Sequence, residues 1–443
     1  MKLLGNGEIA TLNDKDEFIH NGAILIDGSR IIDLGETDFL RSKYPHVEYS
    51  NISHRLVLPG FLNAHMHLYS TFARGMSLNG SPPIRFREIL EKLWWKLDKN
   101  LSTPEEIYYS AMVPLIEGIK SGTTGIIDHH ASFGLISGSL DILEKAAIDT
   151  GVRSVLCYEV SDRWGKESSK QSIKENTRFI KKTQKNKNPL IESTFGLHAS
   201  LTLSNKTLEE SFAEAQRFGT GFHVHVAEGI EDVEDSLKKS KKRVVERLND
   251  FGILSDKTLA IHCVHVNNDE IKILAENGTM VVHNPESNMN NAVGVPPLLE
   301  MNNAGIRIGL GTDGYTPSML ESVKVAYILP KLNYGDPRAG NDIVEKMLLK
   351  NNRAFFERFF NNSVGVIEKG AFADLAILDY YPPTPLNKDN FFYHIIFGIR
   401  EGAVDSVMIN GEFVYLNKKL TKIDEREINF KACGIAKKFW EKM

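Results

Sequence analysis

Cysteine is scarce in this sequence. Only three cysteines occur among its 443 residues, at positions 157, 263 and 433. An odd number of widely separated cysteines argues against a disulfide framework and against a thiolate zinc cluster. We therefore expect a reducing, cytoplasmic environment.

A strong charge bias and long apolar runs are also missing. The net charge is -4, which offers no basic surface for a nucleic acid. No stretch approaches the roughly 20 apolar residues of a membrane span, and the first residues contain no apolar signal segment. We expect neither a nucleic-acid partner nor a membrane.

Two catalytic motifs are absent as well. The sequence contains no Gly-x-x-x-x-Gly-Lys-Ser/Thr loop and no Gly-x-Ser-x-Gly elbow. Neither a P-loop nucleotide hydrolase nor a serine hydrolase with a nucleophile elbow is supported.

What the chain does contain is a series of apolar strand candidates that alternate with helical patterns. Eight such strands, each followed by a helix, are typical of a TIM barrel, so the predicted class is α/β with a (β/α)8 barrel. The strand candidates are residues 61–67, 124–130, 154–160, 190–199, 221–227, 259–266, 279–284 and 307–312.

Short β-like segments around glycines flank this region on both sides. We expect a small β-sandwich-like domain built from both ends of the chain. Residues 1–57 would form its first half, residues 58–365 the barrel, and residues 366–443 its second half plus a terminal helix. An apolar stripe, Ile428, Ala432, Ile435 and Phe439, predicts that this helix docks on the protein's own surface.

Histidines and acids gather where the barrel strands are expected to end. Because catalytic groups of a TIM barrel lie at the carboxyl ends of its strands, these side chains should share one rim. They are His65, His67, His129, His130, Glu159, His198, His225, Glu228, His262, His265, His283 and Asp313.

This set of side chains suits a metal site. Imidazoles with a carboxylate and no cysteine favour zinc or ferrous iron over calcium or magnesium. Three histidines and one aspartate would leave a position for a reactive water. Glu228, three residues past His225, is placed to move its proton.

Several strings resemble the amidohydrolase superfamily, in particular its aminohydrolase and chlorohydrolase branch. They are PGFLNAHMH (59–67), HVAE (225–228), IHCVH (261–265), HNPESN (283–288) and GTDG (311–314). Trp94-Trp95, IDHHAS (127–132) and SNMNN (287–291) resemble one aminohydrolase subgroup of that branch. The resemblance covers nearly the whole chain.

The resemblance implies one divalent metal ion on His65, His67, His225 and Asp313, with zinc expected ahead of iron. It implies that Asp313 helps to deprotonate the water, that Glu228 shuttles its proton, and that His262 hydrogen-bonds the water or the developing oxyanion. Dinuclear members carry a carboxylated lysine where this chain has Gly196-Leu-His198-Ala199, which favours a single ion.

The expected substrate contacts are His198, His129 and Asn288. His129 and His130 are adjacent, so only one of them can face the pocket, and the sequence leaves open which. Ser200 and Asn290 replace a proline and a lysine that the branch often has, which leaves the substrate contacts open.

Other residues near the rim are given structural roles. We expect His223 to pack and Glu159 to hydrogen-bond at its strand end. Trp94, Trp95 and Phe86 could form a lid over a planar ring or a core or dimer contact.

Three functions stay open at this point. The first is hydrolytic deamination of a purine-like heterocycle by a metal-activated water. The second is ring opening of a cyclic amide in a purine or pyrimidine, and the third is an inactive metal-binding scaffold. The expected partner is a small heterocycle, and the protein is expected to be a homodimer.

Overall fold

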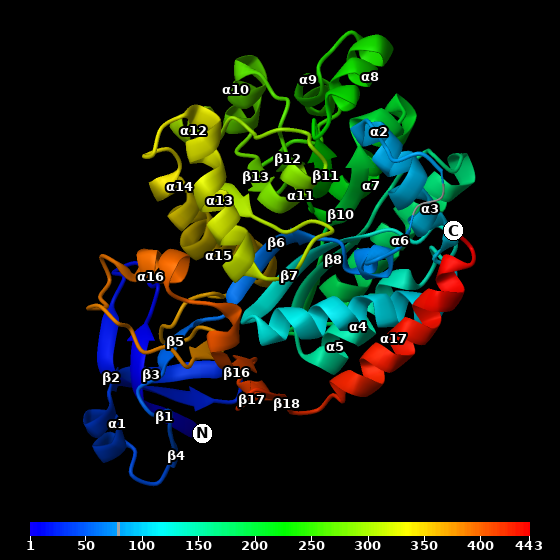
Figure 1. The fold of residues 1–443 in the computed structure, drawn as a ribbon. Coiled ribbons are helices and arrows are strands. Elements are labelled where there is room, and N and C mark those ends of the chain that lie inside the picture. Colours follow the sequence, from blue (N-terminus) through cyan, green and yellow to red (C-terminus); the bar gives the residue numbers. More distant parts are fainter. Residues whose placement is uncertain (78–79) are drawn as a thin grey trace.

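The computed structural model describes residues 1–77 and 80–443. The two ends of the chain meet in one nine-stranded sheet, in the order β18-β17-β16-β15-β5-β1-β2-β3, with β4 paired to β1 (Figure 1). β15 pairs with β5 in antiparallel register, Leu375 opposite Pro59. The strands are β1 Lys2–Ala10, β2 Phe18–Asp27, β3 Arg30–Glu36, β4 Glu48–Asn51, β5 Leu56–Pro59, β15 Leu375–Leu378, β16 Val404–Ile409, β17 Glu412–Leu416 and β18 Lys419–Leu420.

The barrel follows directly from β5. Its strands are all parallel and form two sheets, β6-β7-β8-β9 and β10-β11-β12-β13-β14. The predicted fold class is confirmed, with one difference: the fourth strand is divided into β9 and β10. The strands are β6 Phe61–Met66, β7 Thr123–His130, β8 Arg153–Tyr158, β9 Ile191–Ser193, β10 Phe195–Ala199, β11 Phe222–Val226, β12 Leu259–His262, β13 Met280–His283 and β14 Ile308–Leu310.

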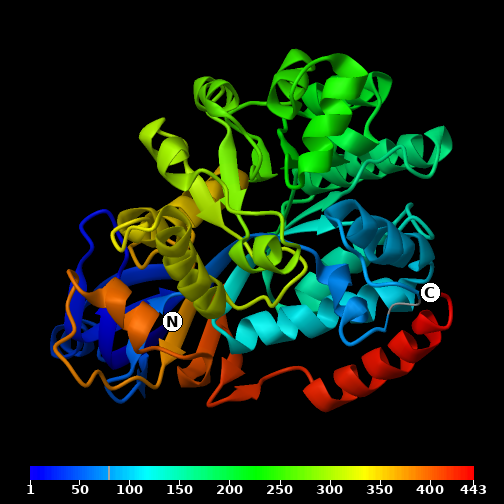
Figure 2. The ribbon, with the colours of Figure 1, turned by 45° about the horizontal axis from the view of Figure 1, so that its top comes forward.

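Helices cover the outside of the barrel strands (Figures 1 and 2). Their ends follow local chemistry: the 17-residue α4 starts at Pro104 behind a capping box in which Thr103 and Glu106 satisfy each other's backbone N–H groups. The helices of the barrel region are α2 Phe86–Ile89, α3 Trp95–Asn100, α4 Pro104–Lys120, α5 Ser139–Thr150, α6 Lys166–Lys185, α7 Asn205–Phe218, α8 Ile230–Ser240, α9 Val244–Asp250, α10 Asn268–Glu276, α11 Pro285–Asn290, α12 Leu298–Asn303, α13 Met319–Tyr334, α14 Asn341–Lys346 and α15 Asn352–Phe360.

The remaining helices are short or lie outside the barrel repeat. α17 runs beside α4 rather than on the small β domain (Figure 2). Phe439 is fully buried there, and Trp440 Nε1 donates to the Phe72 carbonyl at 2.7 Å. Among the described residues no helix is long and apolar enough to span a bilayer. These elements are α1 Thr37–Lys43, η1 Leu68–Ala73, η2 Leu90–Trp94, η3 Ser200–Thr202, η4 Met347–Asn351, α16 Phe391–Phe397, η5 Glu401–Ala403 and α17 Glu425–Trp440.

Two asparagines bridge the seams between the two barrel sheets. Only single bridges, Val160 with Leu197 and Met66 with Asp313, join the sheets along the described chain, so no continuous ladder closes the ring. At the β8–β10 seam, Asn176 Oδ1 accepts from the N–H groups of Tyr158 and Gly196, at 2.9 and 3.2 Å, and its Nδ2 donates to the Tyr158 carbonyl. A side-chain amide therefore replaces the missing ladder bonds.

The other seam is built in the same way. Asn352 Nδ2 donates to the carbonyls of Leu62 and Leu310, at 2.6 and 2.8 Å, and its Oδ1 accepts from the Leu310 N–H. Both asparagines are fully buried. Each one satisfies backbone groups that would otherwise be unpaired in the core.

We predict that Asn176→Leu, which keeps the shape but removes the amide, lowers the free energy of unfolding by about 3 kcal/mol or more. The reason is that three buried backbone groups lose their partner, at ~1–3 kcal/mol each. Urea unfolding followed by circular dichroism measures this change.

The matched control is Asn303→Leu at the exposed end of α12. It should stay within about 0.5 kcal/mol of the wild type. Equal losses in the two variants would contradict the role given to Asn176.

Candidate metal centre and active-site pocket

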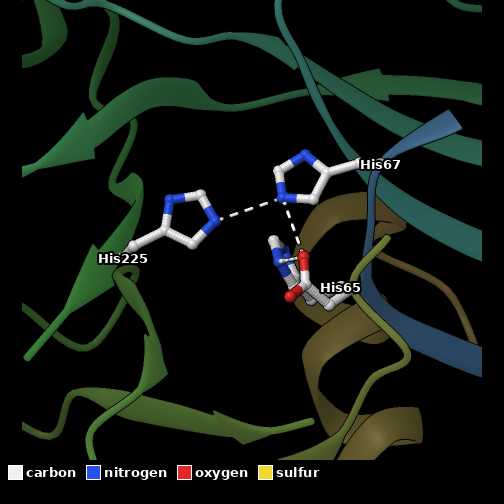
Figure 3. A group of neighbouring side chains, drawn as sticks. His65, His67 and His225 are labelled. Atoms are coloured by element: carbon white, nitrogen blue, oxygen red, sulfur yellow. Dashed lines mark hydrogen bonds and ion pairs between the residues drawn. The ribbon is translucent and has the colours of Figure 1, made fainter. Parts of the chain in front are cut away.

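Four side chains from the two barrel sheets converge at the carboxyl ends of the strands. His65 and His67 come from the end of β6, His225 from β11, and Asp313 follows β14. One ligand atom from each lies within 4.8 Å of the others. His67 Nε2 is 3.0 Å from Asp313 Oδ1 and 3.2 Å from His225 Nε2. Figure 3 shows the three imidazoles turned toward one common point.

The hydrogen bonds behind these rings determine which nitrogen faces the centre. His67 Nδ1 donates to the His129 carbonyl at 2.6 Å, and His225 Nδ1 donates to the His198 carbonyl at 2.9 Å. Because a carbonyl only accepts, the protons are on Nδ1 and the lone pairs on Nε2. If both rings were neutral, two lone pairs would face each other across 3.2 Å beside a carboxylate, so this point needs a cation.

This arrangement fits a divalent cation. His65 Nε2 is also buried without a hydrogen-bond partner. Burial lowers the pKa of His65 to about 3 and that of His225 well below its usual range, so both rings are neutral, as metal ligands must be. At His67, burial lowers the pKa, but the hydrogen bond between Nε2 and the Asp313 carboxylate outweighs it and raises the pKa to about 9, so a proton occupies Nε2 at neutral pH. A metal ion would take the place of that proton.

His223 has a role beyond the packing that we expected. Its Nε2 lies 2.8 Å from His65 Nδ1, and its Nδ1 lies 3.6 Å from Cys157 Sγ. A hydrogen bond to the outer nitrogen of a ligand histidine orients the ring and its tautomer. His223 lies two residues before His225, which indicated that both side chains are on the same face of the strand. The spacing did not indicate that His223 contacts His65.

Glu228, which follows β11, and His262, at the end of β12, face the same centre. His262 Nε2 is 3.5 Å from Glu228 Oε2 and 3.7 Å from Asp313 Oδ2. Burial, helped by the Asp313 carboxylate, raises the pKa of the Glu228 carboxyl well above its usual range. A carboxyl of this kind can hold and release a proton near neutral pH.

The short helix α11 supports all three of these groups. Ser287 Oγ donates to Asp313 Oδ2, and Asn291 Nδ2 donates to Glu228 Oε1 at 3.3 Å. Asn288 Oδ1 accepts from His262 Nδ1 at 2.7 Å. Asn288 is fully buried and is not among the described residues that line the pocket, so its position suits orientation of His262 rather than the expected substrate contact.

The backbone is strained where two of these side chains begin. His262 and Asp313 have φ angles of +69° and +55°. Residues other than glycine adopt this region at a cost of about 1–3 kcal/mol, and histidine and aspartate are among those that do so more often. The strain turns both side chains off their strands toward the centre.

Aromatic side chains line the pocket above the centre. Phe86, Leu90, Trp94 and Trp95, from α2, η2 and α3, form one wall, and His198 lies opposite. His198 Nδ1 is hydrogen-bonded to Thr202 Oγ1 at 2.6 Å. Because Phe86, Trp94 and Trp95 line the pocket, their position agrees with the expected lid over a planar ring. His198 also lines the pocket and so stays a candidate substrate contact.

Among the described residues, neither His129 nor His130 lines the pocket. His129 Nε2 is within 3.0 Å of the Leu197 carbonyl and 3.2 Å of the His223 carbonyl, while His130 Nε2 bonds Ser132 Oγ at 2.9 Å. The expectation that one of the pair reaches the substrate is therefore not supported by their positions.

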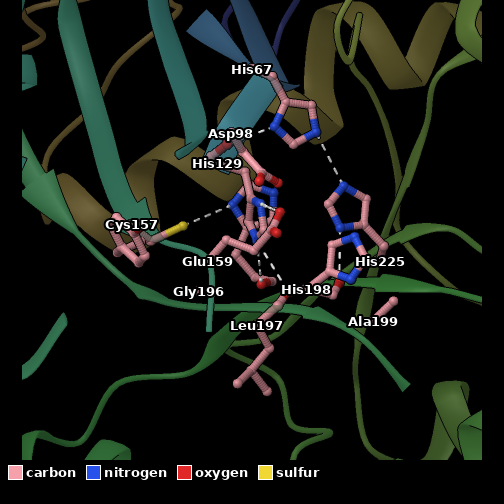
Figure 4. A network of polar contacts seen from close by, with 12 residues as sticks. His67, Asp98, His129, Cys157, Glu159, Gly196, Leu197, His198, Ala199 and His225 are labelled. Atoms are coloured by element: carbon pink, nitrogen blue, oxygen red, sulfur yellow. Dashed lines mark hydrogen bonds and ion pairs between the residues drawn. The ribbon is translucent and has the colours of Figure 1, made fainter. Parts of the chain in front are cut away.

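A buried ionic group that the sequence analysis missed forms the far wall of the pocket. Arg163 Nη2 contacts Asp98 Oδ2 and Glu159 Oε1. Figure 4 shows Asp98 and Glu159 close to His129, and Glu159 Oε2 is 3.4 Å from His129 Nδ1. Burial and Glu159 raise the pKa of Asp98 to about 7. Against the effect of burial, His198 and Arg163 hold the pKa of Glu159 well below its usual range.

Comparison with known proteins defines the class of this chain. Residues 56–414 match the model of the amidohydrolase family. The chain belongs to this family, which confirms the resemblance seen in the sequence. Members of the family bind a divalent metal ion, in agreement with the His/Asp cluster.

Individual relatives within the family are named for specific deaminase activities. The chain is 33% identical over 377 residues, 84% of each chain, to a 5'-deoxyadenosine deaminase of Methanopyrus kandleri. It is 32% identical over 444 residues, 98% of each chain, to a 5-methylthioadenosine/S-adenosylhomocysteine deaminase of Syntrophomonas wolfei. A zinc-bound adenosine deaminase structure from Xanthomonas campestris superposes with a TM-score of 0.84 at 20% identity, covering 99% of this chain and 98% of that one.

We predict that His223→Ala weakens metal binding about 10- to 100-fold, because His65 loses the hydrogen bond that orients it. Asp313→Asn should lose the metal ion more completely, because the centre keeps no anionic ligand. Competition of each purified variant with a chromophoric chelator measures the affinity.

The control is His46→Ala, which removes an exposed histidine in the small β domain. It should bind metal like the wild type. Wild-type affinity in His223→Ala would show that His65 needs no support.

Proposed function

We propose that this chain is a zinc-dependent aminohydrolase that removes the exocyclic amine of an adenosine-like purine. The main support is one observation: the buried three-histidine and aspartate cluster lies beside Glu228 and His262 at the base of an aromatic pocket. Relatives that span most of the chain are deaminases of adenosine derivatives.

His65, His67, His225 and Asp313 are the residues that would hold one divalent ion. When bound, such an ion lowers the pKa of water toward neutrality and so supplies a nucleophile. We favour zinc over ferrous iron, because zinc accepts imidazole and carboxylate ligands in an open four-coordinate site. The absence of a lysine at the end of β10, where Ala199 stands, supports a single ion.

In the proposed reaction Glu228 carries the proton. Its carboxylate takes a proton from the attacking water, and its raised pKa lets it hold that proton at Oε2 near neutral pH. It then passes this first proton to a ring nitrogen of the purine. The second proton of the water, on the hydroxyl of the tetrahedral carbon, goes by way of Glu228 to the amine, which leaves as ammonia. Asn291, which donates to the other oxygen, Oε1, keeps Oε2 turned toward the centre.

His262 acts on the oxygen that adds to the ring. Because its Nδ1 proton is directed at Asn288 Oδ1, its free Nε2 can accept a hydrogen bond from the water. After it takes up a proton, the same atom can donate to the oxygen on the tetrahedral carbon. Ser287 holds Asp313 so that its Oδ1 stays directed at the two β6 histidines.

A simple assay separates the three functions considered above. Deamination releases ammonia and keeps the ultraviolet spectrum of an intact purine ring. Ring opening loses that spectrum, and an inactive scaffold gives neither change although it binds metal. The names of the relatives favour the first outcome.

We predict that Glu228→Gln lowers the rate of ammonia release from 5'-deoxyadenosine or adenosine by about 10²- to 10⁴-fold, the usual contribution of a general acid and base. Metal content should stay unchanged, because Glu228 is not one of the proposed ligands. The measurement combines an ammonia assay with metal analysis of the same sample.

Glu234→Gln, on the exposed face of α8, serves as the control and should keep the wild-type rate. Full activity in Glu228→Gln would overturn the proposed mechanism.

We also propose a cytoplasmic homodimer. The three cysteines are free, in keeping with a reducing compartment. On α13, Ile328 and Leu332 are 61% and 79% exposed, and Phe397 on the adjoining α16 is 66% exposed. Such a patch is typical of a protein interface.

The prediction is that Leu332→Lys yields a monomer at concentrations where the wild type is a dimer, as measured by light scattering, because a charge would be buried in the interface. Phe430→Lys on α17, which replaces another exposed apolar side chain, should stay dimeric. A monomeric wild type would rule the interface out.

A further inference from the structure

The aromatic side of the pocket belongs to a segment that leaves the barrel between β6 and α4. This wall segment consists of η1, α2, η2 and α3. Its middle carries Phe86, Leu90 and Trp94, which line the pocket. The three side chains share an apolar cluster with Val264 and Val293, which follow β12 and α11. Loops of the second barrel sheet therefore hold the middle of the wall segment.

The two ends of the wall segment are held by the end of α17, which is distant in the sequence. Trp440 Nε1 donates to the carbonyl of Phe72 in η1 at 2.7 Å, and the Phe439 ring lies 5.7 Å from the Phe72 ring. At the other end, Asn100 Nδ2 in α3 donates to the Lys442 carbonyl at 3.3 Å. Figure 1 shows the end of α17 beside α3. One short piece of chain thus joins the beginning of the wall segment to its end.

Apolar contacts extend from α17 to the metal centre. Phe439 is fully buried in one cluster with Phe72 and Tyr69. The Tyr69 ring lines the pocket and lies edge-on to His67, with 5.4 Å between the two ring centres. Neither Phe439 nor Trp440 is among the described residues that line the pocket. Any effect of these two residues on a substrate therefore passes through the wall segment.

The contacts of α17 are spread unevenly along the helix. An ion pair links its first turn to α4, but of its 16 residues only Ala432 and Phe439 are buried. Lys442, just past the helix, donates to Ser102 Oγ at 3.1 Å and pairs with Glu106, where the wall segment meets α4. The buried aromatic ring of α17 and the contacts of Lys442 thus lie together at the wall segment.

We propose that residues 439–442, at the end of α17, position the aromatic side of the pocket over the metal centre by holding both ends of the wall segment. The inference rests on the proposed function, in which these aromatic rings pack on the purine. Rings packed on a planar ligand contribute to its binding, and a wall that is already fixed loses less conformational entropy when the ligand arrives. We therefore expect these positioning residues to affect substrate affinity rather than the chemical step.

The test removes one contact at a time. Trp440→Phe keeps an aromatic ring and deletes the N–H that binds the Phe72 carbonyl. We expect KM for adenosine to rise about 3- to 10-fold, the factor that one hydrogen bond contributes, while kcat stays within about twofold and the metal content is unchanged. Exchange of the backbone amides of α2 and η2, followed by mass spectrometry, should become faster by a similar factor.

A second variant, Phe439→Leu, tests the apolar half of the contact. It should act in the same direction, because the contact between the Phe439 and Phe72 rings is lost. The matched control is Phe430→Leu on the same helix, where the side chain is 80% exposed. This control should leave KM, the metal content and the amide exchange of α2 and η2 unchanged.

The outcomes separate this inference from the proposed function. Faster exchange limited to the wall segment, together with a raised KM, supports the inference. Faster exchange in β6 and β7 as well assigns α17 a general role in barrel stability, and an unchanged KM in both variants shows that the wall needs no support, so either result overturns the inference. If no purine releases ammonia, the proposed function is overturned, and the Kd of adenosine for the metal-loaded protein, measured by calorimetry, replaces KM as the readout. A Kd raised in both variants then supports the inference, an unchanged Kd overturns it, and no binding of adenosine overturns both.

Discussion

The site depends on one electrostatic conflict that only a cation resolves. His67 Nδ1 and His225 Nδ1 each donate a hydrogen bond to a backbone carbonyl. This turns both Nε2 atoms toward each other and toward Asp313. The carbonyls that direct the rings belong to the neighbouring strands β7 and β10, so the fold itself holds the two nitrogens beside the carboxylate. A proton on His67 Nε2 relieves the repulsion, in agreement with the raised pKa of this ring, and a metal ion would relieve it through ligand bonds to all three groups.

The conflict lies at one of the two places where the barrel ladder is interrupted. Met66 and Asp313 form the single bridge between β6 and β14, and Asn352 completes that seam with its side chain. A regular ladder would direct the residues after β14 along the strand. The interruption allows the positive φ angle of Asp313, which brings its carboxylate over the β6 histidines. Irregular backbone at this seam is thus part of the site.

The outline of the fold and the metal cluster followed from the sequence because both rest on local rules. Apolar runs marked the eight strand positions, and the strand ends carried the histidines. The sequence did not predict the division of the fourth strand, because that division depends on Asn176, whose side chain extends from α6 to β8 and β10. Asn288 was expected to contact the substrate, whereas its hydrogen bond to His262 depends on how α11 packs.

The far wall shows the same limit more clearly. Asp98 and Arg163 are 65 residues apart and belong to no short motif, so nothing in the spacing indicates that they meet. Glu159 looked like an ordinary strand-end acid, and only its pairing with Arg163 distinguishes it. The pair joins helix α3 to the turn after β8, and packing determines such contacts between distant segments, which the residue pattern does not record.

Two regions of opposite sign therefore divide the pocket. Three neutral imidazoles and one carboxylate would leave a bound divalent ion with net positive charge, while the opposite wall carries two acids against one guanidinium. In the proposed reaction a purine would lie between them, with the carbon under attack on the metal side. The difference in charge between the two sides would orient the substrate before any contact is complete.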